Sequence, residues 1–408
     1  MSQNFSYKSF SGRNFYLLLI LIFGLFSSKA LISIASVALL ANFIFSYKEL
    51  KFDFANLSVM SILVVILIPI SCFVFLLLSP NKNSALERIW SKLPFLLIPL
   101  SLVFNNARSK QYFYFFVAFL IFMLNISGII VLINFFYNLE YYKEIIAQGK
   151  HIPVPIDHIR YSLMLAFGGV SSIFFFFRKN TFLSKFDRFF FGFSAIFIFI
   201  LLHILSVRSG LVSYYLATLF TIIFLAIESR KYFYIPILVI VLALSPYLAY
   251  HNIPSFKNKL DYMKYDLMQL REGEVGHNSD ARRWRSIELG WKMYREKPLL
   301  GFGLGNMEAA VNAFYEENYS EVEEYNRKLP HNQFLFTAVE MGFFGILILF
   351  LALFFPLVVA FKQKNVLFII LSIIILSSCM VENTLESQLG ISFYLIFASL
   401  SLKSYEEE

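Results

Sequence analysis

Residues 329–345 read Leu-Pro-His-Asn-Gln-Phe-Leu-Phe-Thr-Ala-Val-Glu-Met-Gly-Phe-Phe-Gly, and they join a long polar segment to a long apolar one. Pro330 cannot continue a preceding helix, so the pattern predicts that His331 lies at or near a helix N-terminus, at the edge of a membrane. At about 100° per residue, the helix face of His331 also carries four further residues: Leu335, Ala338, Gly342 and Gly345. Because small residues let another helix approach, the stretch is also open to interpretation as a helix-packing motif with an incidental His.

The composition is that of a membrane protein. Of the 408 residues, 58% are hydrophobic and only 15% are charged, whereas about half of a soluble domain is apolar. The charged residues cluster between apolar runs of membrane-spanning length. We therefore predict an all-α fold, a polytopic helical membrane protein. The net charge of +8 is accounted for by Lys and Arg beside the spans, so no nucleic-acid partner is expected.

We predict about twelve transmembrane helices and no cleavable signal peptide. They divide the chain into a membrane domain of about nine spans at 1–250, a long loop at 251–332 and about three C-terminal spans at 333–408. The predicted spans are 14–28, 31–46, 56–78, 90–105, 111–138, 159–177, 189–206, 209–227, 232–250, 333–361, 365–380 and 388–402.

The basic residues predict the orientation in the membrane. With the N-terminus inside, the cytoplasmic segments hold 15 of the 35 Lys and Arg residues, and the short outer loops hold 8. The other 12 lie in the long loop, which does not count because long loops translocate largely regardless of charge. Both termini are therefore expected in the cytoplasm and the long loop outside. The loop at 80–92 is more basic than an outer loop should be.

The long loop is predicted to hold one small extracytoplasmic helical segment. A Lys- and Tyr-rich stretch at 256–271 and a turn-rich patch at 272–279 precede Asp280, the expected N-cap of a helix at 281–296. Aromatic and aliphatic residues recur there at helical spacing: Trp284, Ile287, Trp291 and Tyr294. Five cations occupy the other positions: Arg282, Arg283, Arg285, Lys292 and Arg295. The pattern is typical of a helix in the membrane interface, or of an amphipathic helix packed on its own domain.

Residues 297–306, Lys-Pro-Leu-Leu-Gly-Phe-Gly-Leu-Gly-Asn, carry three glycines at alternate positions, which predicts a turn or a close backbone approach. The stretch is neither a Walker loop nor a dinucleotide fingerprint. The sequence has no His-x-x-x-His pair, no Cys-x-x-Cys and no paired Asp motif. We therefore predict no metal and no cofactor.

The candidate chemical groups are one imidazole and two sources of arginine. Arg208 opens the helix after the span at 189–206, where free backbone N–H groups favour an anion such as pyrophosphate, unless the side chain only snorkels to headgroups. More guanidinium groups come from the loop helix, on Arg282, Arg283 and Arg285. A neutral His331 can act as a base. The set suits removal of a proton from a hydroxyl while a departing phosphate is stabilised.

Other ionisable groups compete with this assignment. Glu340 lies two turns inside a predicted span, where such a group is a functional hypothesis by default, but it falls on the face opposite His331. Glu382 and Glu386 are the other competing carboxylates. His203, within a span, is expected to be a packed or hydrogen-bonded core residue.

The chain resembles the O-antigen ligase and polymerase superfamily of bacterial envelope glycosyltransferases. His331-Asn332, nine residues and then Gly342-Phe-Phe-Gly345 fit the family pattern His-Asn/Ser/Gln, nine residues, Gly-x-x-Gly. The stretches at 282–284 and 298–306 resemble the family's loop, and Arg208-Ser-Gly resembles its outer arginine. The resemblance is best at 207–346, and the first 190 residues match only in hydropathy.

The resemblance implies a metal-independent, inverting transfer of a polysaccharide from undecaprenyl pyrophosphate, at the periplasmic face of the inner membrane. The acceptor is a lipid A–core sugar hydroxyl in a ligase and another lipid-linked repeat in a polymerase. His331 would be the base, with Asn332, Gly342 and Gly345 as its supporting motif. The pyrophosphate would be held by Arg208 and by one arginine of the loop helix, where Arg282, Arg283 and Arg285 all fit.

We favour a ligase, although a polymerase shares the length and the single large loop. A transporter or flippase predicts paired halves and a polar midplane site, whereas the sequence shows few mid-span charges and no half-repeat. A purely structural membrane scaffold leaves the His-Gly motif unexplained.

Overall fold

The computed structural model describes residues 10–49, 56–103, 110–148, 150–178, 183–271 and 279–405. Within these ranges the chain forms helices and no strands, which confirms the all-α prediction. The predicted turn-rich patch lies outside the described residues except for Ser279, which is helical. The chain divides into two compact units. The first comprises Met1–Ser109, Tyr265–Asn365 and Cys379–Glu408, and the second comprises Lys110–Lys264 and Val366–Ser378.

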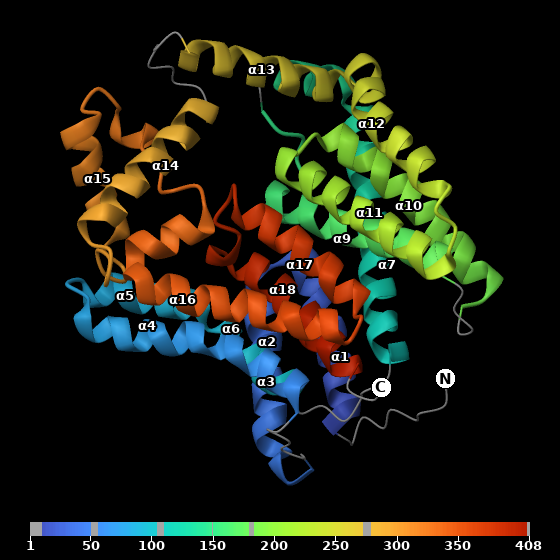
Figure 1. Cartoon of the computed structure of the whole chain (residues 1–408), viewed down its shortest axis with the longest axis horizontal. Coiled ribbons are helices and arrows are strands. Elements are labelled where there is room, and N and C mark those ends of the chain that lie inside the picture. Colours follow the sequence, from blue (N-terminus) through green and yellow to red (C-terminus); the bar gives the residue numbers. More distant parts are fainter. Residues whose placement is uncertain are drawn as a thin grey trace. The chain divides into compact units, whose positions relative to one another are not determined.

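The first unit holds both ends of the chain and most of the predicted loop. Its helices are α1 (Phe10–Ser27), α2 (Lys29–Phe45), η1 (Tyr47–Glu49), α3 (Leu57–Leu63), η2 (Val64–Ile66), α4 (Leu67–Leu78), α5 (Lys82–Lys92), α6 (Pro94–Val103), α14 (Ser279–Glu296), α15 (Met307–Asn318), η3 (Glu324–Asn326), α16 (Gln333–Lys362), η4 (Thr384–Glu386) and α18 (Gln388–Ser404). In Figure 1 the orange helix α16 runs beside α4, and the two helices are in contact.

The second unit is a bundle around α9. Its helices are α7 (Lys110–Tyr137), α8 (Leu139–Ala147), α9 (His158–Phe177), α10 (Lys185–Leu205), α11 (Arg208–Ser229), α12 (Tyr234–Asn252), α13 (Pro254–Arg271), whose end passes into the first unit, and α17 (Val366–Cys379). Helix α9 packs against α7, α10 and α11. The approach of α11 to α9 depends on Gly210, where a Cβ would overlap the side chain of Ser162.

Each of the twelve predicted spans contains a helix, although two of them are not simple. The segment at 56–78 divides into α3, η2 and α4, and the segment at 90–105 contains only the short α6 after the end of α5. Seven described helical stretches are long and apolar enough to cross a membrane, so the chain is an integral membrane protein. The number of spans, the orientation of the termini and the division at 250 and 332 remain predictions.

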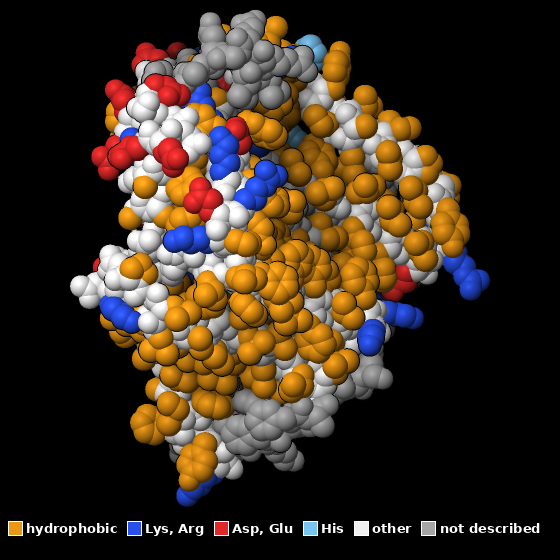
Figure 2. Space-filling view, turned by 60° about the vertical axis from the view of Figure 1, so that its left-hand side comes forward, with side chains coloured by type: hydrophobic (Ala, Val, Ile, Leu, Met, Phe, Trp, Pro, Cys, Tyr) orange, Lys and Arg blue, Asp and Glu red, His pale blue; other side chains and the backbone are white. Residues whose placement is uncertain are grey.

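The apolar surface of α16 also fits a bilayer. Apart from Lys362 at its end, its exposed side chains are all hydrophobic, and six of them recur every three or four residues: Phe343, Leu347, Phe350, Phe354, Val358 and Phe361. Such a stripe on one helix face indicates contact with lipid rather than water. In Figure 2 hydrophobic side chains cover most of the described surface in view, acidic side chains gather at the upper left, and basic side chains lie there and along the right-hand and lower edges.

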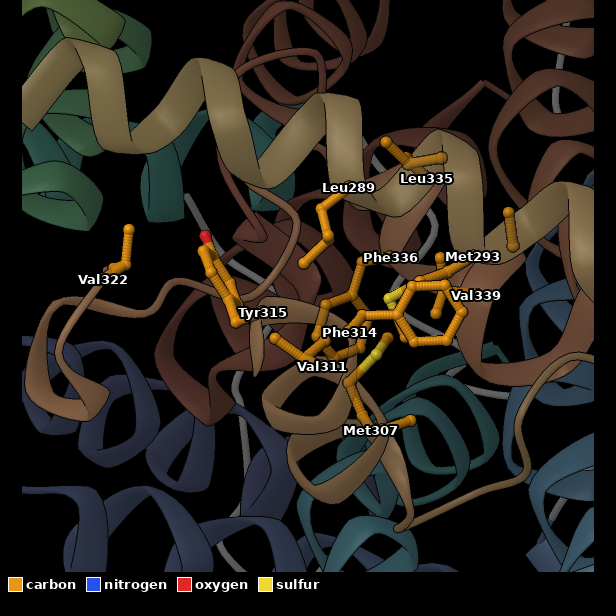
Figure 3. Close-up of a cluster of buried hydrophobic side chains, with 12 residues drawn as sticks. Leu289, Met293, Met307, Val311, Phe314, Tyr315, Val322, Leu335, Phe336 and Val339 are labelled. Atoms are coloured by element: carbon orange, nitrogen blue, oxygen red, sulfur yellow. The ribbon is translucent and has the colours of Figure 1, made fainter. Parts of the chain in front are cut away.

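The segment before α16 packs on the beginning of that helix. Leu289 and Met293 of α14, Phe314 of α15, and Phe336 and Val339 of α16 belong to one buried cluster. Figure 3 shows side chains from the three helices pointing toward one another. This cluster fixes α14 and α15 against the part of α16 that follows His331.

Helix α14 differs in two respects from its prediction. It begins at Ser279, so Asp280 lies in the helix rather than at its N-cap. The aromatic stripe is also divided: Tyr294 and Ile287 pack on the buried cluster, whereas Trp284 and Trp291 are 62% and 52% exposed. Aliphatic residues rather than the aromatic set form the buried face, so the helix packs on its own domain. The exposed tryptophans leave the predicted contact with the membrane interface open.

Candidate functional site

The position of His331 at a helix N-terminus is confirmed. Helix α16 begins at Gln333, and Asn332 is its N-cap: the Asn332 side-chain oxygen accepts a hydrogen bond from Leu335 N at 3.0 Å. Asn332 Nδ2 donates to the carbonyl of Met380 at 2.9 Å. The second residue of the His-Asn pair therefore starts the helix and also ties it to the chain after α17.

Helix α14 holds the backbone of His331. The His331 N–H donates to Ser286 Oγ at 3.2 Å, and the buried Ser286 hydroxyl donates to the carbonyl of Arg283 at 2.7 Å. The helix comes this close because of Gly290, where a Cβ would lie 2.8 Å from the side chain of Leu335. The candidate base and the helix that carries three of the candidate arginines are thus joined by direct hydrogen bonds and close packing.

The carboxylate of Glu382 lies between His331 and Arg283. Glu382 Oε2 is 3.4 Å from His331 Nδ1, and Glu382 Oε1 accepts a hydrogen bond from Arg283 Nη2 at 2.8 Å. The Glu382 side chain is only 6% exposed, whereas those of His331 and Arg283 are 23% and 38% exposed. His331 Nδ1 makes no hydrogen bond at this separation. A small rotation of the ring would let Glu382 accept from Nδ1–H and leave Nε2 as the basic atom.

The three candidate arginines of α14 have different partners. Arg282 Nη1 donates to Asn326 Oδ1 at 2.7 Å, and the Arg285 guanidinium lies 5.9 Å from the centre of the Tyr319 ring. Arg283 alone of the three is paired with the carboxylate that also faces His331. Sequence reasoning left this choice open, and the geometry favours Arg283 as the member nearest the candidate base.

A largely buried group of four charged side chains lies next to this site, in the same unit. Arg88 of α5 contacts Glu340 through Nε at 3.0 Å and Glu386 through Nη2 at 2.5 Å. Lys92 Nζ lies 2.6 Å from Glu386 Oε1, and Gln333 Nε2 donates to the same oxygen at 2.6 Å. A cavity of about 20 Å³, large enough for one water molecule, adjoins both carboxylates. Glu340 is therefore engaged with Arg88 rather than with His331.

The charge balance of this group governs its titration. Burial alone would raise the pKa of Glu386, but the ammonium of Lys92 and the guanidinium of Arg88 outweigh burial and lower the pKa to about 2. The same carboxylates keep the pKa of Arg88 above its usual value, although burial opposes the charge. Glu386 and Arg88 are therefore ionised at neutral pH, in a group that pairs two acidic with two basic side chains.

The two glycine motifs interlock. Gly342 has φ 63° and ψ −155°, and this break in α16 frees the carbonyls of Val339 and Glu340. These carbonyls accept hydrogen bonds from Phe302 N at 2.8 Å and Gly303 N at 3.1 Å. The predicted close approach of the stretch at 297–306 is thus confirmed, and its partner is the Gly-Phe-Phe-Gly stretch.

The break corrects one expectation. The helix face counted from His331 through Leu335 to Gly345 is not continuous, because the helical phase is lost at Gly342. A Cβ at Gly345 would lie 2.5 Å from the Cβ of Met341, in the distorted turn of the same helix. The glycines of the motif therefore serve a kink rather than a continuous small face, whereas Leu335 and Ala338, before the break, do pack in the cluster with α14 and α15.

In the second unit, Arg208 is the first residue of α11, as predicted. Arg208 and His331 belong to different units, so their meeting at one substrate remains a prediction. His203 is a buried core residue, as expected: its Nε2 lies 2.7 Å from the hydroxyl of Tyr215. Within the described ranges, no three His, Cys, Asp or Glu side chains come together as metal ligands could.

Sequence reasoning missed Arg88, Lys92 and Ser286. A signal for the first two existed in the excess of basic residues at 80–92, which conflicted with an outer loop. The structure gives the reason, because Arg88 and Lys92 are neutralised by buried carboxylates. One acidic partner was also visible, because Glu386 stands between two apolar runs.

The fold and the site define a class of integral membrane protein. In this class a polar helical segment packs on the start of a long apolar helix. An arginine of that segment and a buried carboxylate then lie beside a histidine. Residues 192–350 match the family model described as O-antigen ligase. The match includes Arg208, His331 and both glycine motifs, and it confirms the resemblance to the O-antigen ligase and polymerase superfamily. No curated protein matches the chain.

Proposed function

We propose that the protein transfers a polysaccharide from undecaprenyl pyrophosphate to a sugar hydroxyl, without a metal, at the periplasmic face of the inner membrane. The observation that carries the proposal is the contact of His331 with the buried carboxylate of Glu382, which also binds Arg283. His331 and Arg283 lie within the segment that matches the O-antigen ligase family, and Glu382 follows it in the sequence. The substrates are those that the family implies.

The chemistry is a single displacement. His331 Nε2 takes the proton of the acceptor hydroxyl as its oxygen forms a bond to the anomeric carbon of the donor sugar. The bond from that carbon to the phosphate oxygen breaks, and undecaprenyl pyrophosphate leaves with the electron pair. Attack opposite the leaving group inverts the anomeric configuration. Glu382 stabilises the imidazolium that results.

The arginines replace a metal as the counter-charge to the leaving diphosphate. Arg283 is 38% exposed, so it can pair with a phosphate in addition to Glu382. A guanidinium grips two phosphate oxygens through parallel N–H groups. Arg208, at the N-terminus of α11, adds the free N–H groups of a helix end. Arg282 and Arg285 of α14 reinforce the positive potential.

We favour a ligase with a lipid A–core acceptor, and the alternative is a polymerase that joins lipid-linked repeats. A lipopolysaccharide gel of a strain that lacks the gene distinguishes them. A ligase defect leaves bare core and accumulated lipid-linked polymer. A polymerase defect leaves single repeats on the core. An unchanged ladder would contradict both.

The catalytic proposal is tested by His331→Ala. Because a general base typically contributes about 10²–10⁴-fold, we expect transfer to fall by that factor while the protein still inserts and accumulates. The measurement is transfer of the strain's own lipid-linked polysaccharide to its lipid A–core by purified protein. Asn312→Ala, at a half-buried position of α15, serves as the control. Normal transfer by His331→Ala would remove the base assignment.

A further inference from the structure

We infer that Arg88 and Lys92 of α5 are positioning residues for the candidate catalytic pair. They hold the chain at 380–386 in place, and thereby keep the carboxylate of Glu382 opposite His331. The kinetic part of this inference rests on the proposed function, because it takes His331 as the base. The structural part stands on the contacts alone.

The chain at 380–386 is tied down through its own backbone. Lys92 Nζ donates to the carbonyl of Leu385 at 2.7 Å, and Leu385 N–H donates to Gln333 Oε1 at 2.9 Å. At the other end, Asn332 Nδ2 donates to the carbonyl of Met380. Two of these partners are the residues that directly follow His331. The carboxylate and the imidazole are therefore held by one set of bonds.

Glu386 anchors this chain through its side chain. It accepts from Lys92, Arg88 and Gln333, and it is only 12% exposed. Arg88 extends the anchor to α16, because it also binds Glu340 and stacks 5.0 Å from the centre of the Phe336 ring. Helix α5 thus grips both the chain that carries Glu382 and the helix that begins after His331.

The cost of this arrangement argues for a role in positioning. Two buried and two largely buried charged groups pay a desolvation penalty that hydrophobic residues of the same size would avoid. Ionic contacts instead fix the positions of the side chains, since the carboxylates of Glu340 and Glu386 are each held by two or three directed hydrogen bonds. Glu382 needs such definition, because Arg283 binds one of its oxygens and His331 faces the other. A displacement of about 1 Å in a catalytic arrangement can lower the rate about a hundredfold.

The test variant is the double substitution Arg88→Gln with Glu340→Gln. Arg88→Gln alone would leave a buried carboxylate without its cation and could prevent folding. The double substitution removes one charge of each sign, so the buried group stays neutral and Lys92 still binds Glu386. The matched control is Arg13→Gln, which removes another arginine of the same unit whose partners are Asn42 and Ser46. Both the double substitution and Arg13→Gln are made in wild-type protein and in the Glu382→Gln variant.

The first measurement is the transfer rate. We expect the neutral double variant to lower kcat about ten- to a hundredfold with KM for the donor within about twofold, since no substrate contact is lost. In Glu382→Gln the same change should lower kcat by less than about threefold, because residues that act through one another are not additive. The inference would be overturned if the double substitution left kcat unchanged. It would also be overturned if the double substitution lowered kcat by the same factor in wild-type protein and in Glu382→Gln. Arg13→Gln should have equal effects in both backgrounds.

The second measurement is amide hydrogen exchange over 380–386, which requires no catalysis. We expect the amide of Leu385 to exchange faster in the neutral double variant and to be unaffected in His331→Ala. Unchanged exchange in the double variant would refute the anchoring. If His331→Ala retains transfer while the double variant shows fast exchange, the proposed function fails and the anchoring stands.

Discussion

At the scale of single residues, the protein places His331 and Arg283 by partners distant in the sequence. Asn332 could be predicted as the start of a helix, because Pro330 and the change from polar to apolar residues are local signals. The role of Arg88 could not be predicted, because its partner Glu340 lies 252 residues further along the chain. Local patterns therefore predict where His331 and Arg208 sit on their helices, and they say nothing of which carboxylate faces them.

The choice among the arginines of α14 shows the same limit. Arg282, Arg283 and Arg285 all fit the family pattern, and helical spacing alone does not distinguish them. Only the position of Glu382, which comes from another part of the chain, separates Arg283 from the other two. Tertiary contact decides the site here, and no short-range rule could have replaced it.

The titration of Glu386 leads to a prediction about stability. Its pKa in the folded protein is about 2, below the usual 4.5, so its contribution is complete above pH 4.5 and is lost as the pH falls toward 2. The shift corresponds to about 3 kcal/mol. We expect Glu386→Gln to be less stable than wild type by about that amount at pH 7, with the difference shrinking below pH 4.5. Thermal unfolding in detergent at several pH values measures it.

The control for that prediction is an exposed ion pair. Glu316, 71% exposed, lies 3.2 Å from Arg327, and such pairs contribute about 0–1 kcal/mol. Glu316→Gln should therefore have little effect at any pH. A difference between wild type and Glu386→Gln that is the same at pH 3 and pH 7 would contradict the assignment of the charge state.

At the scale of helices, hydropathy predicted the elements and missed the break in one of them. Twelve segments expected as spans contain helices, and α16 ends one residue after its predicted limit. Length and apolarity carry this information because a span must bury its backbone polar groups in lipid. The kink at Gly342 is invisible to such counting. It depends on the hydrogen bonds that the chain at 298–303 offers.

The kink predicts a large effect of Gly342→Ala. The backbone angles of Gly342 belong to a region that only glycine adopts readily, which costs other residues about 1–3 kcal/mol. A Cβ would also overlap the carbonyl of Leu299, so that the two glycine motifs could not interlock. We expect a loss of at least that amount in thermal unfolding, together with a loss of transfer.

Gly192→Ala is the control for the kink. Gly192 is helical, and its added Cβ would meet only the edge of the Phe176 ring, 2.9 Å away. Alanine favours a helix over glycine by about 1 kcal/mol, which offsets a small shift of that ring. Equal stabilities of the Gly342 and Gly192 variants would show that the kink is not required.

At the scale of the whole molecule, Arg208 belongs to one unit and His331 to the other, and a role of Arg208 in binding the donor is what the family resemblance implies. Arg208→Lys keeps the charge but loses the planar fork that grips two phosphate oxygens. We expect KM for the lipid-linked donor to rise about tenfold, equivalent to about 1.4 kcal/mol, with a smaller change in kcat. Arg160→Lys is the control: this arginine also lies in the first turn of a helix of the second unit, and it pairs with Asp157.

If Arg208 and Arg283 bind the same diphosphate, the effects of Arg208→Lys and Arg283→Lys on KM should not be additive. A wild-type KM in Arg208→Lys would instead make Arg208 a membrane anchor, and the site would belong to the first unit alone.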